Sequence, residues 1–125
     1  MRKLFAVGLF SLFMLNTSMA LAAEALSIEV KLGSYYIKPE KITVKRGQPV
    51  TLNLVNEATL LPHNLIIKAP ETGVDIAVDV SAGKTASVSF TPTQSGNYEI
   101  FCSKEPPFGK SHKEKGMHGV LEVVD

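Results

Sequence analysis

"YEIFCSKEPPFGKSHKEKGMHGVLEVV", residues 98–124, is the stretch that decides how this chain folds. It opens and closes with an apolar run, and both runs have the pattern of a β-strand. Between them lie the chain's only cysteine, Cys102, and two of its three histidines, His112 and His118. Met117 directly precedes His118. A loop between two strands therefore collects most of the side chains that bind soft metal ions.

The direction of these side chains follows from the alternation of a strand. In "NYEIFC", Tyr98, Ile100 and Cys102 share one face, so an inward-pointing Ile100 aims Cys102 at the inner edge of the fold. In "HNLII", His63 likewise shares a face with Leu65. We therefore expect His63 and Cys102 to meet at one end of the domain, although they are far apart in the sequence.

The rest of the chain is also a series of short strands. Alternating runs occupy residues 27–30, 41–44, 49–55 and 86–90, with glycine, proline, asparagine and serine between them. No segment has the pattern of a long helix. Strands at intervals of about ten residues predict an all-β fold: an antiparallel Greek-key β-sandwich or barrel of about seven to eight strands.

The first 22 residues have the layout of a secretory signal peptide: a basic start, an apolar run, and small residues before a cleavage site after Ala22. An uncleaved membrane anchor is the alternative, because residues 4–23 are nearly long enough to cross a bilayer. Polar residues at 16–18 and the lack of a basic stop-transfer cluster favour cleavage. We expect a mature domain of residues 23–125 in the periplasm, free of the membrane.

Composition narrows the function further. The predicted signal carries two of the 13 basic residues, which leaves 11 basic and 12 acidic residues and a mature net charge of −1. That balance argues against a nucleic-acid-binding protein, which needs a basic surface. A single cysteine cannot close an internal disulfide, so an exported thiol has to be buried, paired between chains, or bound to a ligand.

The side chains near the last strand form a ligand set of known chemistry. One thiolate, two imidazoles and a weak thioether are the ligands of copper electron-transfer sites. The chain offers one candidate for each role, in His63, Cys102, His112 and Met117. We therefore expect one Cu(I)/Cu(II) ion. A buried core histidine, an inert buried thiol and a core methionine are the structural alternatives.

The second imidazole has two candidates. Neighbours on an extended segment point in opposite directions, so Met117 and His118 do not easily face the same ion. This favours His112, with His118 as a surface residue. His118 stays open as the alternative ligand because nine residues separate Cys102 from His112.

Several motifs together resemble the cupredoxin family of small blue-copper proteins, which includes plastocyanin, pseudoazurin and azurin. They are "YYIKPEKITVKRGQPVTLNLVNE" at 35–57, "PHNL" at 62–65, "YEIFC" at 98–102 and "GMHG" at 116–119. The resemblance covers the mature chain and implies a cupredoxin-like fold and a type 1 copper site. It also implies that Asn64 ties the ligand loops together and donates a hydrogen bond toward the cysteine sulfur.

One feature departs from that pattern. Plastocyanin and azurin have only a few residues between the cysteine and the second histidine, whereas residues 103–111 intervene here. Prolines and a glycine in this insert can fold it into a turn that returns His112 to the metal. The longer loop leads us to expect a more tetragonal and greener site.

The resemblance implies a single-electron carrier rather than an enzyme, because a copper ion with all positions filled leaves no place for substrate. Its partners would be redox proteins, such as cytochrome-like or oxidase- or reductase-like donors and acceptors. We expect a monomer that binds neither nucleic acid nor membrane. A periplasmic copper chaperone is the alternative. Two weaker alternatives are a metal-free interaction domain and a copper site with an open coordination position that binds a small ligand or carries out chemistry.

The loops also predict a docking surface. Apolar residues of the two ligand loops are expected to form a collar around an exposed ligand histidine, through which the electron leaves: Leu60, Leu61, Pro62, Pro106, Pro107 and Phe108. Lysines of the closing loop, Lys104, Lys110, Lys113 and Lys115, outnumber Glu105 and Glu114. This excess of positive charge suggests an acidic partner face.

Overall fold

A computed structural model describes residues 3, 8, 11, 13–15 and 24–125 of the chain. The predicted signal peptide, residues 1–22, lies largely outside the described residues, so its cleavage after Ala22 stays a prediction. In the described part of the chain, we find no helix with the length and apolar character needed to cross a membrane.

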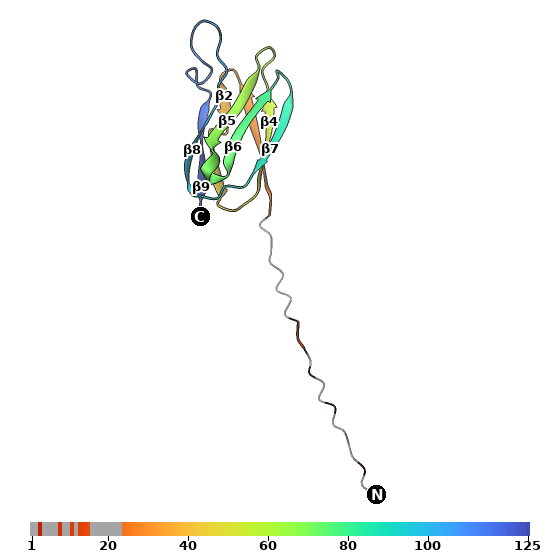
Figure 1. The fold of residues 1–125 in the computed structure, drawn as a ribbon. Helices are drawn as coiled ribbons and strands as arrows, with labels where there is room; N and C mark the ends of the chain where they lie inside the picture. Colours follow the sequence, from red (N-terminus) through yellow and green to blue (C-terminus); the bar gives the residue numbers. More distant parts are fainter. Residues whose placement is uncertain (1–2, 4–7, 9–10, 12, 16–23) are drawn as a thin grey trace.

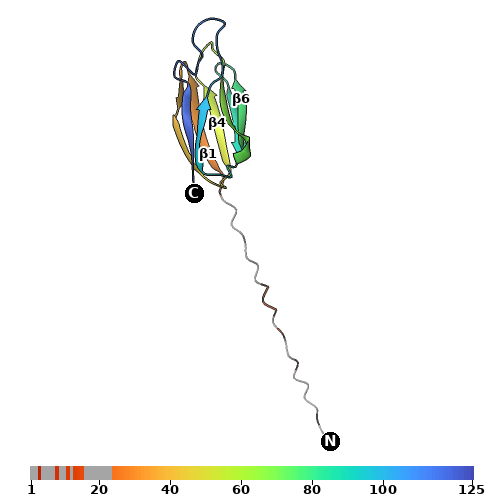
Figure 2. The ribbon, with the colours of Figure 1, turned by 60° about the vertical axis from the view of Figure 1, so that its left-hand side comes forward.

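The described residues form two β-sheets that pack face to face (Figure 1, Figure 2). The strands are β1 (Leu26–Gly33), β2 (Tyr36–Lys38), β3 (Lys41–Lys45), β4 (Val50–Asn56), β5 (His63–Ala69), β6 (Val74–Val80), β7 (Thr85–Phe90), β8 (Gly96–Phe101) and β9 (His118–Val124). One sheet has the order β2-β1-β4-β7 and the other β3-β9-β8-β5-β6. A single turn of 3-10 helix, η1 (Pro70–Thr72), joins β5 to β6. The predicted all-β sandwich is confirmed.

The described residues contain nine strands, more than the seven to eight expected. β2 has only three residues, too few for a recognisable alternation. In β6, buried Val74 and Ile76 alternate with exposed Asp75 and Ala77. Aspartate and alanine are uncommon in strands, which hides this element in the sequence.

Two strand pairings are parallel, whereas the sequence predicts antiparallel ones. β1 pairs with β4, and β3 pairs with β9, in parallel. Parallel neighbours need a long connection between them. The sandwich supplies it, because the chain crosses to the second sheet for β3 before it returns to the first for β4. The other pairs are antiparallel, as expected.

The core lies between the two sheets. In β4, Val50, Leu52 and Leu54 are buried and alternate with half-buried residues, as the pattern predicts. Each such side chain contributes about 1.5–3 kcal/mol through burial. β5 differs, because its first five residues are all buried and two of them, His63 and Asn64, are polar. β5, which lies between β8 and β6, thus places two polar side chains in the core at its first end.

That end of the sandwich holds both loops that the sequence singles out. The loop before β5, residues 57–62, and the long loop between β8 and β9 project from the same end (Figure 1, Figure 2). The C-terminus lies at the opposite end. His63 and Cys102 each lie at the point where a strand of the same sheet meets one of these loops.

Candidate metal centre

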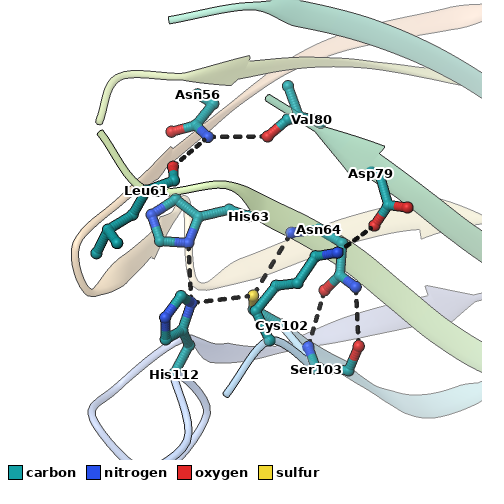
Figure 3. Close-up of polar contacts among 10 residues, drawn as sticks. Asn56, Leu61, His63, Asn64, Asp79, Val80, Cys102, Ser103 and His112 are labelled. Atoms are coloured by element: carbon teal, nitrogen blue, oxygen red, sulfur yellow. Dashed lines mark hydrogen bonds and ion pairs between the residues drawn. The ribbon is translucent and has the colours of Figure 1, made fainter. Parts of the chain in front are cut away.

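Three side chains from three segments converge at the loop end of the sandwich. His63 begins β5, Cys102 follows β8, and His112 lies in the long loop. All three are buried, and their ligand atoms lie within 4.8 Å of one another. The Nδ1 atoms of His63 and His112 are 3.2 Å apart, and Cys102 Sγ lies 3.7 Å from His112 Nδ1 (Figure 3).

These separations suit a single metal ion. Bonds of about 2.0–2.3 Å to nitrogen and sulfur, with angles of about 100–120°, put two ligand atoms of one ion roughly 3.2–3.8 Å apart. The measured distances of 3.2 Å and 3.7 Å fall in this range. One sulfur and two imidazole nitrogens form a soft donor set that suits copper better than hard cations.

The long loop returns His112 to Cys102 by a backbone closure. The His112 N–H donates to the carbonyl of Lys104 at 2.9 Å, so residues 105–111 project outward as a separate loop (Figure 1). The Met117 N–H donates to the His112 carbonyl and the Cys102 N–H to the Met117 carbonyl, both at 3.1 Å. The insert therefore lengthens the loop without separating the candidate ligands.

Met117 and His118 point in opposite directions, as alternation predicts. Met117 is fully buried, and its backbone is hydrogen-bonded to both Cys102 and His112. His118 is exposed. The structure thus brings His112, and not His118, beside Cys102.

Asn64 connects the two loops. Its Nδ2 donates to Ser103 Oγ, and its Oδ1 accepts from the Ser103 N–H, both at 2.8 Å (Figure 3). The backbone N–H of Asn64 points at Cys102 Sγ over 3.5 Å. This is the arrangement that the resemblance implies for Asn64: the side chain ties the loops together, and the backbone N–H is directed at the sulfur.

Asn56 was not among the candidate residues, yet it fixes the loop before His63. Its Nδ2 donates to the carbonyls of Leu61, at 3.0 Å, and Val80, at 2.9 Å (Figure 3). Its Oδ1 accepts from the Ala58 N–H at 2.9 Å. Asn56 is buried at the end of β4. Asn56 continues the alternating series of buried positions in β4, and a polar residue at such a position was the feature of the sequence that could have identified it.

Ser34 and Tyr35 were also missed, because they lie in a short turn far from the ligand loops in sequence. Ser34 Oγ lies 3.3 Å from His63 Nε2, so it can accept the ring N–H and leave the Nδ1 lone pair free. The Tyr35 ring centroid lies 5.1 Å from that of His112 and 6.5 Å from that of His63.

Burial sets the electrostatics of the two imidazoles. Desolvation, with a smaller contribution from His112, lowers the pKa of His63 to about 4. Burial also lowers the pKa of His112, and Lys115 and Lys104 add to the effect. Both rings are therefore neutral near pH 7, which is the state that binds a metal ion.

The predicted docking surface needs two corrections. Leu60 and Phe108 are exposed, but His63 is fully buried and His112 is only 6% exposed, so the exposed ligand histidine is reduced to a small part of His112. The turn that carries Ser34 and Tyr35 contacts both histidines: Ser34 and Tyr35 lie against His63, and Tyr35 also lies against His112.

The second correction concerns charge. Lys104 lies 3.1 Å from Asp79, and Lys113 forms an ion pair with Glu99. These carboxylates come from β6 and β8 and offset the excess of lysine in the loop. An acidic partner therefore does not follow from the local charge.

Comparison with known proteins agrees with this geometry. The family model for the cupredoxin-like domain matches residues 4–121. The chain belongs to this family. With the family established, the buried His-Cys-His cluster identifies the cofactor of this cupredoxin-like protein as one copper ion. A search of curated proteins gives no significant match.

Solved structures share the fold of this cupredoxin-like chain. A dithionite-reduced auracyanin from Roseiflexus castenholzii has a TM-score of 0.66 at 22% identity, over 82% of this chain and 99% of that one. Auracyanin A, a "blue" copper protein from Chloroflexus aurantiacus, has a TM-score of 0.62 at 22% identity, over 80% and 99%. A multi-copper oxidase from Pseudomonas thermotolerans has a TM-score of 0.63 at 14% identity, over 82% of this chain but 30% of the oxidase.

Proposed function

We propose that this chain is an exported, single-electron carrier in which His63, Cys102 and His112 would hold a copper ion, with the Met117 thioether as a weaker fourth ligand. The observation that carries the proposal is the buried cluster of one thiol sulfur and two Nδ1 atoms. Bound copper would supply the Cu(I)/Cu(II) couple.

The surrounding residues have distinct roles in this proposal. Ser34 holds His63 in the tautomer that leaves Nδ1 free. The Asn64 N–H stabilises negative charge on Cys102 Sγ. The buried thioether of Met117 would complete the site, because the Met117 backbone already joins Cys102 to His112.

A carrier fits the cluster better than an enzyme does. His63, Cys102 and His112 are all buried, so a substrate has no direct access to the ion. The surface cavity next to them is lined by Gly33, Ser34, Tyr36, Glu57, Ala58, Thr59, Leu60 and Leu61, and includes none of the three. Electron transfer needs no such access.

Export and partners rest on the sequence. The signal-like residues 1–22 support a periplasmic location and a mature domain of residues 23–125. The partners would be redox proteins, such as cytochrome-like or oxidase- or reductase-like donors and acceptors. We propose that the mature protein acts as a monomer.

The test is the visible and electron paramagnetic resonance spectrum of residues 23–125 loaded with Cu(II). We expect an intense sulfur-to-copper charge-transfer band that Cys102→Ser abolishes. His112→Ala should change the spectrum strongly, and the matched control His118→Ala should leave it unchanged. A preparation that binds copper but stays colourless under oxidising conditions would indicate a copper chaperone and contradict the proposal.

A further inference from the structure

Backbone pairing fixes only the start of the loop that leads to His63. The Glu57 N–H donates to the Leu32 carbonyl at 2.8 Å. In the described part of the chain, no other backbone–backbone hydrogen bond involves residues 57–62. His63 follows this loop as the first residue of β5. The position of its imidazole therefore depends on what holds the far end of the loop.

The side chain of Asn56 holds that far end. Its Nδ2 donates to the carbonyls of Leu61, at 3.0 Å, and Val80, at 2.9 Å (Figure 3). Leu61 lies two residues before His63, and Val80 is the residue of β6 that pairs with His63 in the sheet. A single amide group thus fixes the backbone on both sides of His63, along the chain and across the strands.

Asn56 is itself held firmly. It is 1% exposed and ends β4, which belongs to the sheet opposite β5 and β6. Its backbone N–H donates to the Lys84 carbonyl at 2.9 Å, and its carbonyl accepts from the Gly83 N–H at 3.1 Å. Its Oδ1 accepts from the Ala58 N–H at 2.9 Å. Every donor and acceptor of Asn56 is therefore engaged, which leaves the buried amide a single orientation.

We infer that Asn56 is the positioning residue for His63: it fixes the start of β5 so that the imidazole already faces Cys102 and His112 before a metal ion binds. This inference rests on the proposed function. A site that is assembled in advance loses little free energy to rearrangement on binding, so it binds more tightly. With the Asn56 amide removed, His63 can shift, and copper is bound more weakly and with a changed spectrum.

The opposite end of β5 provides a matched control. Thr72 lies in η1, directly after β5, and is 3% exposed. Its Oγ1 donates to the Ala69 carbonyl at 2.7 Å. Thr72 is thus also a buried polar side chain that fixes a backbone carbonyl at one end of β5. Thr72→Val keeps the shape of the side chain and removes this bond far from the proposed ligands.

The first experiment follows amide hydrogen exchange by mass spectrometry in the copper-free mature protein. Asn56→Ala should speed exchange in residues 58–65 about tenfold relative to residues 70–76, because the local opening becomes easier. Thr72→Val should give the reverse pattern. Equal acceleration of both segments in Asn56→Ala would mean that the amide contributes only to global stability, and the inference fails. Asn56→Ser, whose hydroxyl can donate to one carbonyl, replaces the alanine variant if that variant does not fold.

The second experiment measures Cu(I) affinity by competition with bicinchoninate, and the electron paramagnetic resonance spectrum of the Cu(II) form. Asn56→Ala should weaken Cu(I) binding about tenfold, equivalent to about 1.4 kcal/mol, and should change the copper hyperfine splitting. Thr72→Val should match the wild type in both measurements, although it also removes a buried hydrogen bond.

Wild-type affinity and wild-type hyperfine splitting in Asn56→Ala would overturn the inference, and so would equal changes in the Thr72→Val control. Failure of the proposed function gives a different result, namely a wild-type protein without the charge-transfer band. In that case the exchange experiment, which needs no copper, still shows whether Asn56 fixes the start of β5.

Discussion

The two buried imidazoles face each other through their Nδ1 atoms, 3.2 Å apart. When Nε2 carries the proton, each Nδ1 presents a lone pair, so the nitrogens repel unless a cation or a proton lies between them. The contact of Ser34 with Nε2 favours this tautomer in His63. At the scale of single residues, the centre is arranged for a positive ion.

The lowered histidine pKa predicts how the copper-free protein responds to acid. Folded His63 has a pKa of about 4, against 6.5 for an unperturbed histidine, so the unfolded chain binds more protons between these values. The free energy of unfolding should therefore fall as pH drops from about 6.5 to about 4, by a few kcal/mol at most at about 1.4 kcal/mol per pKa unit. Urea titrations at pH 7 and pH 4.5 measure this.

His63→Gln is the comparison for that prediction, because it removes the titrating ring. The variant should lose less stability on acidification than the wild type. Equal losses in the two proteins would show that His63 does not carry the pH dependence.

Asn64 gives a second prediction at this scale. Asn64→Ala removes two hydrogen bonds to the exposed Ser103, each contributing about 0.5–1.5 kcal/mol. It should lower the stability of the copper protein by about 1–3 kcal/mol. Thermal unfolding measures the change, with exposed Asn97→Ala as the control near zero. A similar loss in both variants would mean that the Asn64 bridge contributes nothing specific.

At the scale of elements, the long loop separates into a structural part and an outer part. The bond from the His112 N–H to the Lys104 carbonyl closes the loop below residues 105–111. The segment after it is tied to Cys102 by the Met117 carbonyl. The segment from His112 to Met117 is therefore the structural part, and it alone is hydrogen-bonded to the backbone of Cys102.

Shortening the outer loop should therefore leave the centre intact. Deletion of residues 106–109 keeps Lys104, Ser111 and His112, and should preserve the position and intensity of the charge-transfer band. Halving such a loop changes the closure free energy by only about 0.6 kcal/mol. A visible spectrum that disappears or shifts strongly would show that the insert shapes the centre itself.

At the scale of the whole molecule, the alternation of β4, "NYEIFC" and "HNLII" was enough to predict a sandwich and the meeting of His63 with Cys102. The parallel pairings were not predictable, because they depend on which sheet each strand joins. The contact of Tyr35 with both imidazoles was missed for a similar reason. The turn that carries Tyr35 is distant in sequence and has no metal-binding residue.

We propose that His63, Cys102 and His112 bind one copper ion at the loop end of this sandwich. X-ray absorption spectroscopy at the copper edge, on protein with one equivalent of metal, tests it most directly. We predict one short copper–sulfur bond and two imidazole nitrogens in the wild-type protein, and no such sulfur neighbour in Cys102→Ser. A spectrum that fits only nitrogen and oxygen neighbours in the wild-type protein would contradict this claim.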